Sequence, residues 1–396
     1  MGKRKRGRIS RCMCLLWWVI VVSLVCSPPL LTGKAWAESH TVAQEEPETS
    51  AQAAILMDVE SGRTLFEHNS EEPLRIASIT KIMTAIVAIE QGDLKDQVEA
   101  SENAVGVEGS SIYLRPGETL SLEDLLYGLM LRSGNDAAVA IAEHIGGSVE
   151  GFVYLMNQKA EELGMEQTVF SNPHGLDTHE EHYSTAKDMA VLTAYSLKNE
   201  TFATIVATKK WTAPLEGEKW DRVWYNKNRL LAKYEYADGV KTGYTKRANR
   251  TLVSSATKDG HQLVAVTLND GDDWNDHMRM FEFGFDQFTM VTLAKKNQKI
   301  TDERVQREDG YFRLMNHFRY PLRDNESVRK KLVVDAALEE GTSTTVPYPA
   351  GYVYYELDGE EIGRTPVEFV QEEKQRRSIF DRLKQVIGVM LGGLYG

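Results

Sequence analysis

The chain has 396 residues, of which 42% are hydrophobic and 26% charged, a globular composition with enough length for two domains. Its net charge is −12, but the first 37 residues carry seven basic and no acidic side chains, so residues 38–396 carry −19. All three cysteines lie within the first 26 residues. These counts disfavour a disulfide-stapled scaffold, a Cys-ligated metal site, a cysteine nucleophile and a nucleic-acid partner for the rest of the chain.

Residues 1–37 have the pattern of a secretory signal peptide. Residues 3–11 are basic, residues 13–25 are almost wholly apolar, and Ala35-Trp36-Ala37 is a small-x-small cleavage site. The alternatives are a transmembrane anchor, for which the apolar run is shorter than the roughly 20 residues needed, and a lipoprotein anchored at Cys26. We therefore expect the mature chain to be extracytoplasmic.

A disordered linker is predicted over residues 38–50, which are polar and acidic, and the fold should begin near Ala51. The pattern from there to residue 291 mixes strands with helices. Asp259-Gly260 between two alternating runs is a hairpin signal, which predicts an antiparallel sheet. The expected strands are 53–57, 64–66, 251–257 and 262–268, and the expected helices are 79–90, which is apolar on nearly all sides, 122–131 and 136–145.

The composition changes after about residue 290 toward charged residues and short alternating strands. We expect a small β domain over 292–375, with strands at 352–357 and 361–363 around Asp358-Gly359. Residues 376–396 then show one apolar helical stripe with basic side chains at its start. This pattern favours an amphipathic helix on a membrane surface, the alternative being a helix that packs against the β domain.

Because the expected mature chain has no cysteine, a covalent mechanism needs a serine, a threonine or a lysine, and a serine must be activated by a neighbouring base. Ser-x-x-Lys places the two side chains on one helix face, and it occurs at Ser78, Ser184 and Ser255. Ser255 lies in a predicted strand and Ser184 in a polar stretch at a helix start. Only Ser78 opens a buried helix, where desolvation lowers the pKa of Lys81 and makes it a base. The N–H groups of that helix terminus can also face an oxyanion.

Two further segments supply polar groups of the kind that such a reaction needs. Ser133-Gly134-Asn135 lies in a break after an apolar run, where Ser133 can pass a proton to a leaving amine and Asn135 can hold a substrate amide. Ser101-Glu102-Asn103 has the same spacing without a packed helix before it. Lys241-Thr242-Gly243, followed by Tyr244, occurs once. On an exposed strand edge it offers an ammonium, a hydroxyl and a backbone N–H for the oxyanion.

Ser-x-x-Lys, Ser-x-Asn and Lys-Thr-Gly in this order are the signature of penicillin-binding proteins and class A β-lactamases. The chain resembles that superfamily and, more narrowly, the D-alanyl-D-alanine carboxypeptidases of serine peptidase family S11. The resemblance covers about residues 51–290. It implies an α+β fold whose catalytic domain, over 51–291, has an antiparallel sheet with helices on both sides. The blocks that carry it are 77–84, 132–138, 170–177 and 184–188.

The resemblance implies that Ser78 attacks the D-Ala–D-Ala bond of a peptidoglycan stem pentapeptide and releases the terminal D-Ala, with Lys81 as the base. Ser133, Asn135 and Lys241 then relay protons and position the substrate, and Thr242 contacts its carboxylate. Penicillin acylates the same serine. Neither a cofactor nor a metal is implied. The expected location is the outer face of the cytoplasmic membrane.

The sequence departs from the family where an arginine usually binds the substrate carboxylate, because residues 272–277 contain none. Arg247, Arg250 and Arg279 are the candidate replacements. Two other functions therefore stay open: a serine β-lactamase and a catalytically silent peptidoglycan-binding protein. No glutamate stands in a convincing place to activate a deacylating water, which disfavours the β-lactamase.

Several polar clusters have simpler interpretations than a functional site. His174 in the Asn-Pro-His-Gly turn is expected to be structural. His179 and His182 are expected to lie in a solvated loop and not at a metal. Asp270, Asp272 and Asp273 after a strand are typical of a turn.

Overall fold

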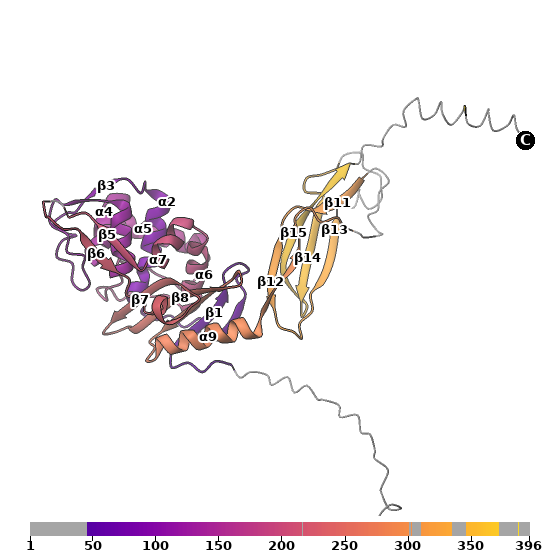
Figure 1. Ribbon diagram of the computed structural model, residues 1–396, viewed down its shortest axis with the longest axis horizontal. Helices are drawn as coiled ribbons and strands as arrows, with labels where there is room; N and C mark the ends of the chain where they lie inside the picture. Colours follow the sequence, from indigo (N-terminus) through magenta and orange to yellow (C-terminus); the bar gives the residue numbers. More distant parts are fainter. Residues whose placement is uncertain are drawn as a thin grey trace, which may run out of the picture. The chain divides into compact units, whose positions relative to one another are not determined.

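The computed structural model describes residues 46–215, 217–300, 302, 310–334, 346–371 and 387 (Figure 1). The predicted signal peptide over 1–37 and, apart from Ile387, the predicted helix over 376–396 lie outside these residues. None of the described helices combines the length and hydropathy of a membrane span.

An antiparallel sheet of five strands organises the first domain, as the alternating patterns predicted. Its order places the first two strands beside the last three, so residues more than 190 positions apart are neighbours, such as Ala53 and Leu268. The strand that contains Lys241-Thr242-Gly243 lies at one edge of the sheet. In spatial order the strands are β2 (Thr64–His68), β1 (Ala53–Asp58), β9 (His261–Leu268), β8 (Asn249–Lys258) and β7 (Ala237–Thr245).

Helices cover both faces of this sheet (Figure 1), which confirms the predicted layering. Successive side chains of a strand point to opposite faces. Ile55 and Val266 accordingly pack into one core with the first six helices, whereas Leu56 and Ala265 pack with Phe281 on the other face. The six helices are α2 (Lys81–Gln91), α3 (Leu122–Tyr127), α4 (Asn135–Gly146), α5 (Val149–Glu162), α6 (Ala186–Leu197) and α7 (Glu200–Ala207), and the other face carries α9 (Asp273–Gln287).

The helix predicted over 122–131 changes its form part-way along. Its α-helical part is α3, and the chain continues as a π-helical turn, η2 (Gly128–Arg132). Ser133 follows with a left-handed φ of 65°. Short π segments are frequent at functional sites because they re-aim the residues that follow.

The contacts of the first domain begin before Ala51, the residue at which the fold was predicted to start. Thr49 and Ser50 both donate hydrogen bonds to the Asp276 carboxylate, so the last residues of the predicted linker bind the fold. The smaller elements are β3 (Gln97–Glu99) with β4 (Thr119–Ser121), β5 (Lys210–Ala213) with β6 (Arg222–Tyr225), and the short helix α8 (Leu230–Lys233).

The second domain is all-β, as predicted, with its own apolar core around Phe312, Val353 and Tyr355. Its hairpin turns at Asp358-Gly359. Its first strand, β10, starts at Thr289, three residues before the predicted domain boundary at residue 292. The strands are β10 (Thr289–Ala294) paired with β12 (Phe318–Leu322), and a sheet of β11 (Gly310–Leu314), β15 (Glu360–Gln371), β14 (Gly351–Leu357) and β13 (Arg329–Val334).

Candidate active site

Ser78 lies in a short 3₁₀ turn, η1 (Ala77–Thr80), that leads directly into α2. Its Oγ accepts a hydrogen bond from the Lys81 Nζ at 3.1 Å. The same nitrogen donates to Asn135 Oδ1 at 2.7 Å and to the His174 carbonyl oxygen at 2.6 Å. The Asn135 and His174 acceptors therefore hold the amine against the serine hydroxyl, and a neutral amine satisfies both with its two N–H groups while its lone pair faces Ser78 Oγ.

Lys81 is completely buried, which makes a neutral amine favourable there. Burial lowers the pKa of Lys81 well below its ordinary value, and the nearby Lys241 and Lys227 lower it further, whereas Asp136 opposes them. A neutral amine can accept the proton of an attacking hydroxyl, which an ammonium cannot. The environment thus favours the form of Lys81 that can act as a base.

Gly175 allows a turn over residues 172–177 to approach the nucleophile segment. Its φ is +86°, and a Cβ at this position would lie 1.8 Å from the Ala77 carbonyl oxygen. The turn is closed by Asn172, whose Oδ1 accepts the Gly175 N–H at 2.7 Å. This close approach brings the His174 carbonyl to Lys81, a contact that the sequence motif did not indicate.

Ser133 and Asn135 stand on either side of the break between η2 and α4, and both are buried. Asn135 accepts from Lys81 and donates through Nδ2 to the Glu108 carbonyl at 2.5 Å. Its neighbour Asp136 accepts backbone N–H groups of Ile112 and Leu114, the longest at 3.1 Å. The break therefore anchors the loop that forms one wall of the cleft.

The edge strand β7 forms the opposite wall. A Cβ on Gly243 would lie 2.3 Å from Thr251 Oγ1 and 3.0 Å from the Ser78 backbone nitrogen, so only glycine allows β7 to pass this close to Ser78. Tyr244 follows and is 64% exposed. The backbone of β7 is thus next to Ser78, as an oxyanion site shared by the two segments requires.

Lys241 is buried, although the sequence placed it on an exposed strand edge. It is 1% exposed, because its side chain points inward from β7, and its Nζ donates to the Thr242 carbonyl at 2.8 Å. Burial lowers the pKa of Lys241 to about 7, with the charge of Lys227 as a further cause. The strand is at the sheet edge, but the lysine belongs to the interior of the site.

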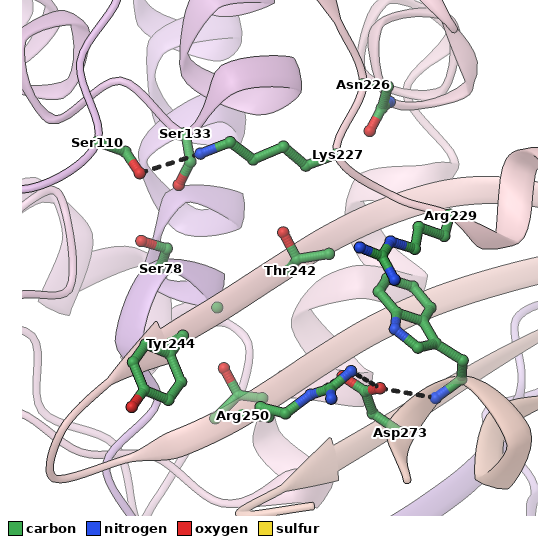
Figure 2. Close-up of a pocket in the computed structure, with 13 residues that line it drawn as sticks. Ser78, Ser110, Ser133, Asn226, Lys227, Arg229, Thr242, Tyr244, Arg250 and Asp273 are labelled. Atoms are coloured by element: carbon green, nitrogen blue, oxygen red, sulfur yellow. Dashed lines mark hydrogen bonds and ion pairs between the residues drawn. The ribbon is translucent and has the colours of Figure 1, made fainter. Parts of the chain in front are cut away.

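A cavity of about 710 Å³ opens above Ser78 (Figure 2). Five predicted residues line it, namely Ser78, Ser133, Thr242, Gly243 and Tyr244. Lys81, Asn135 and Lys241 are buried beneath that surface. Of the other lining residues, only Arg250 was a candidate from the sequence. These residues are Ser110, Asn226, Lys227, Arg229, Arg250, Thr251, Asp273 and Trp274.

Lys227 is the least expected of these residues. Its Nζ donates to Ser110 Oγ at 3.0 Å, the contact drawn as a dashed line in Figure 2, and it lines the same cavity as Ser133. Burial and the charge of Arg132 lower the pKa of Lys227. It lies in a segment without a recognised motif, so no local signal distinguished it from a surface lysine.

The three arginines proposed for the substrate carboxylate have different places. Arg250 lines the cavity, where its guanidinium binds the Asp273 carboxylate (Figure 2). Arg247 instead binds Glu180, and Arg279 binds Asp276 on α9, away from the cavity lining. Arg250 is therefore the one of the three that faces Ser78 across the cavity.

The other copies of the motifs do not form a site. Ser184 hydrogen bonds to Thr168, whereas Lys187 pairs with Glu71 on the surface. Ser255 donates to Asp238. Ser101 donates to Glu143 on α4 and is not among the residues that line the cavity.

The histidines have structural contacts. His174 is buried, and burial, together with the charge of Lys81, lowers its pKa to about 3. The prediction of a solvated loop is wrong for His182, which is 2% exposed between Thr80 Oγ1 and the Ser171 N–H, because the loop folds back over η1. Among the described residues, no group of three or more His, Cys, Asp and Glu side chains is arranged to hold a metal ion.

Aspartates after β9 do more than form a turn. Asp270 accepts from Ser50 Oγ at 2.7 Å and is buried, and Asp273 begins α9. Burial raises the pKa of Asp270 to about 6. Asp270 therefore fastens the N-terminal segment to the end of β9, and Asp273 connects Arg250 of β8 to the start of α9.

Comparisons with known proteins agree with the geometry. The model of the D-alanyl-D-alanine carboxypeptidase family, peptidase family S11, matches residues 40–272. The chain is 33% identical over 373 residues to D-alanyl-D-alanine carboxypeptidase DacF of Bacillus subtilis, covering 89% of this chain and 93% of that protein. It is 37% identical over 293 residues to DacC of Escherichia coli, covering 70% and 71% of the two chains.

Solved structures show the same fold. Penicillin binding protein 5 from Haemophilus influenzae superimposes with a TM-score of 0.68 at 27% identity, over 83% of this chain and 98% of that one. The D-alanyl-D-alanine carboxypeptidase from Mycobacterium tuberculosis gives 0.58 at 32% identity, over 61% and 93%. With the family match, these similarities show that the chain belongs to the D-alanyl-D-alanine carboxypeptidases of serine peptidase family S11.

Proposed function

We propose that this protein is a serine-type carboxypeptidase that removes the terminal D-Ala from peptidoglycan stem pentapeptides through an acyl-enzyme on Ser78. The observation that carries the proposal is the 3.1 Å contact between Ser78 Oγ and the buried Lys81 amine, beneath an open cavity. Family membership supplies the substrate class.

Acylation begins when neutral Lys81 takes the hydroxyl proton of Ser78. The serine oxygen attacks the carbonyl carbon of the penultimate D-Ala, and the carbonyl oxygen becomes an oxyanion. Backbone N–H groups of Ser78 and Tyr244 would receive that oxyanion, an assignment supported by the close approach of Gly243 to the Ser78 nitrogen. Preorganised donors of this kind stabilise the charge without having to reorient.

Collapse of the tetrahedral intermediate breaks the C–N bond and requires a proton on the leaving amine. Ser133 is the donor in this proposal, because it lines the same cavity as Ser78, and the proton that Lys81 took from Ser78 would replace the one that Ser133 gives to the leaving amine. Asn135 has its Oδ1 and Nδ2 engaged by Lys81 and by the Glu108 carbonyl, so it orients Lys81 from beneath the cavity surface. Water then hydrolyses the ester and restores Ser78.

Carboxylate recognition is assigned to Thr242 and Arg250. Both line the cavity, and Arg250 is held by Asp273 in a fixed orientation. A guanidinium donates two parallel hydrogen bonds to a carboxylate, which suits the free C-terminus of the stem peptide. Arg229 lines the same cavity and adds positive charge.

Penicillin would acylate Ser78 by the same attack and leave slowly. Among the described residues that line the cavity, Asp273 is the acidic one, and Arg250 already binds its carboxylate. This lining offers no free carboxylate to activate a water for rapid hydrolysis of a penicilloyl ester, which favours a carboxypeptidase over a β-lactamase.

The proposed location of the enzyme is based on the sequences of its two terminal segments. We assign export to residues 1–37 and attachment to the outer face of the cytoplasmic membrane to the apolar stripe of 376–396. The body between them is strongly acidic, so it would be repelled from an anionic leaflet while the basic start of the helix is attracted.

The decisive experiment is mass spectrometry of the purified protein after incubation with a penicillin and then with pentapeptide. Ser78→Ala should lose both the covalent adduct and the release of D-Ala. Ser184→Ala, which alters another Ser-x-x-Lys, should keep both even if its buried hydrogen bond is lost. An adduct on Ser78→Ala would overturn the nucleophile, and labelling without D-Ala release in the wild type would indicate a silent penicillin-binding protein.

A further inference from the structure

Three charged side chains outside the cavity connect the segments that build it. Glu180 accepts hydrogen bonds from Arg247 Nη1 at 2.8 Å and from Arg247 Nη2 at 2.7 Å. The same carboxylate accepts from Arg75 Nη2 at 2.7 Å. We call these three residues the rim triad.

Each residue of the rim triad stands close in sequence to a part of the site. Arg75 precedes Ser78 by three residues, and Arg247 follows Tyr244 by three. Glu180 lies in the loop that follows the His174 carbonyl, the acceptor of Lys81. The triad therefore joins the nucleophile turn, the loop of residues 176–183 and the turn between β7 and β8.

Arg75 is well anchored, so it can serve as the fixed end of this connection. Its Nη1 also donates to the His179 carbonyl at 2.9 Å, and its side chain is only 15% exposed. The neighbouring Leu74 exchanges backbone hydrogen bonds with Ser184. Glu180 is held on one side by this anchored guanidinium and reaches Arg247 on the other.

The turn between β7 and β8 needs support from outside the sheet. β7 is the edge strand, so its backbone is paired on one side only, with β8. The Tyr244 N–H lies just before this turn, and a displacement of the strand moves it relative to the Ser78 N–H. A bidentate arginine–carboxylate pair fixes direction as well as distance.

We propose that Glu180 is a positioning residue for the reaction: by bridging Arg75 and Arg247 it fixes the β7–β8 turn against the nucleophile turn and so sets the spacing of the two oxyanion donors. This inference rests on the proposed roles of Ser78 and Tyr244. Glu180 itself contacts no reacting atom. The two arginines hold the pKa of Glu180 down to about 2, so the bridge stays charged over the working pH range.

The test compares Glu180→Gln with the wild type in a stopped-flow assay of acylation by a fluorescent penicillin. Loss of an oxyanion donor costs about 100- to 1,000-fold in catalytic rate, so its displacement should slow acylation about 10-fold. The affinity for an alanine-derived boronic acid, whose adduct on Ser78 mimics the tetrahedral intermediate, should fall by the same factor. KM for pentapeptide should stay within twofold, because ground-state binding does not use the oxyanion donors.

Controls separate positioning from general stability. Glu71→Gln removes another exposed ion pair, with Lys187 at 2.5 Å, and should leave acylation and boronic acid affinity unchanged. Arg247→Lys keeps the charge but loses the bidentate geometry, so its acylation rate should lie between those of Glu180→Gln and the wild type. Raising the salt concentration should narrow the difference between the wild type and Glu180→Gln, since the triad is exposed.

Acylation of Glu180→Gln within twofold of the wild type would overturn the inference, as would a loss confined to KM. If Glu180→Gln does not fold, Arg247→Lys and Glu180→Asp provide the same comparison of acylation rate with boronic acid affinity. Ser78→Ala separates a failure of the proposed function from a failure of the inference about the rim triad. Covalent labelling of Ser78→Ala by penicillin would refute the proposed function. If Ser78→Ala is not labelled and Glu180→Gln reacts like the wild type, only the role of the rim triad is refuted.

Discussion

The buried centre of the cleft and its exposed rim use charged residues in opposite ways. At the centre, Lys81 and Lys241 are almost inaccessible, and burial lowers both pKa values toward the neutral amine. At the rim, Glu180 is 79% exposed, and Arg247 and Arg75 lower its pKa to about 2 and keep it ionised. Burial favours the neutral amine that a general base needs, whereas exposed ion pairs stay charged at little desolvation cost, as the proposed positioning role of Glu180 requires.

The largest effect is expected at the centre, from Lys81→Arg. Arginine stays protonated and cannot accept the proton of Ser78, and a general base contributes about 100- to 10,000-fold to a rate. We expect acylation by penicillin to fall about 1,000-fold or more in a stopped-flow assay. Lys187→Arg, on the exposed lysine of the second motif, should react at the wild-type rate. A Lys81→Arg enzyme within tenfold of the wild type would exclude Lys81 as the base.

The pH profile tests the same centre without a mutation. Because the neutral amine is the reactive form, acylation should decrease as the pH falls through the lowered pKa of Lys81. An unburied lysine would give this decrease near its ordinary pKa of about 10.4. Acylation that is already lost at pH 9 would contradict the lowered pKa.

Gly175→Ala should give the next largest effect, on stability. A Cβ there lies 1.8 Å from the Ala77 carbonyl oxygen, so the turn must move away from η1, at a cost of about 3 kcal/mol in the free energy of unfolding. Gly164→Ala is the matched control: its φ of +71° is similar, but no atom lies within 4 Å, so about 1 kcal/mol is expected. Urea unfolding measures both. Equal losses would mean that backbone conformation, and not the close approach, matters at Gly175.

In the cavity lining, Arg250→Ala should reduce kcat/KM for pentapeptide about 10- to 100-fold, since a hydrogen bond to a charged group contributes about 1.5–3 kcal/mol. A stem peptide that ends in an amide tests the reason. It lacks the carboxylate, so the variant and the wild type should cleave it at similar rates. Arg279→Ala should leave both substrates unaffected. A loss of equal size on both peptides would move carboxylate recognition to another residue.

The smallest effect is expected from Lys241→Met, measured by thermal unfolding. The folded-state pKa of Lys241 is about 7, below its ordinary 10.5, so between these values the unfolded chain binds more protons and wild-type stability rises with pH. The methionine variant, which should be inactive, is therefore expected to be more stable by about 1 kcal/mol at pH 7. Because wild-type stability rises by about 1.4 kcal/mol per pH unit in this range, that advantage should disappear and then reverse between pH 7 and pH 10, and parallel stability curves would contradict it. Lys187→Met provides the exposed comparison.

Much of the fold was predictable because local patterns indicated it. The alternating runs around Asp259-Gly260 and Asp358-Gly359 form the predicted hairpins, and the apolar stretch after Ser78 forms α2 inside the core. The π-helical turn before Ser133 was not predictable from these patterns. It depends on how the segment packs, and an apolar run that continues through it looks like an ordinary helix.

The sequence by itself determined the pair at the heart of the site, because Ser78 and Lys81 are three residues apart on one helical turn and need no distant partner to meet. It also disfavoured a thiol mechanism, since every cysteine lies within the predicted signal peptide. Only the tertiary structure decided which Ser-x-x-Lys faces a cavity, that Lys241 is buried and that Arg250 and Lys227 share the cleft. The burial of Lys81 and Lys241, and therefore their lowered pKa values, depend on contacts between segments that are far apart in the sequence. A local sequence pattern does not indicate which distant segments will pack together.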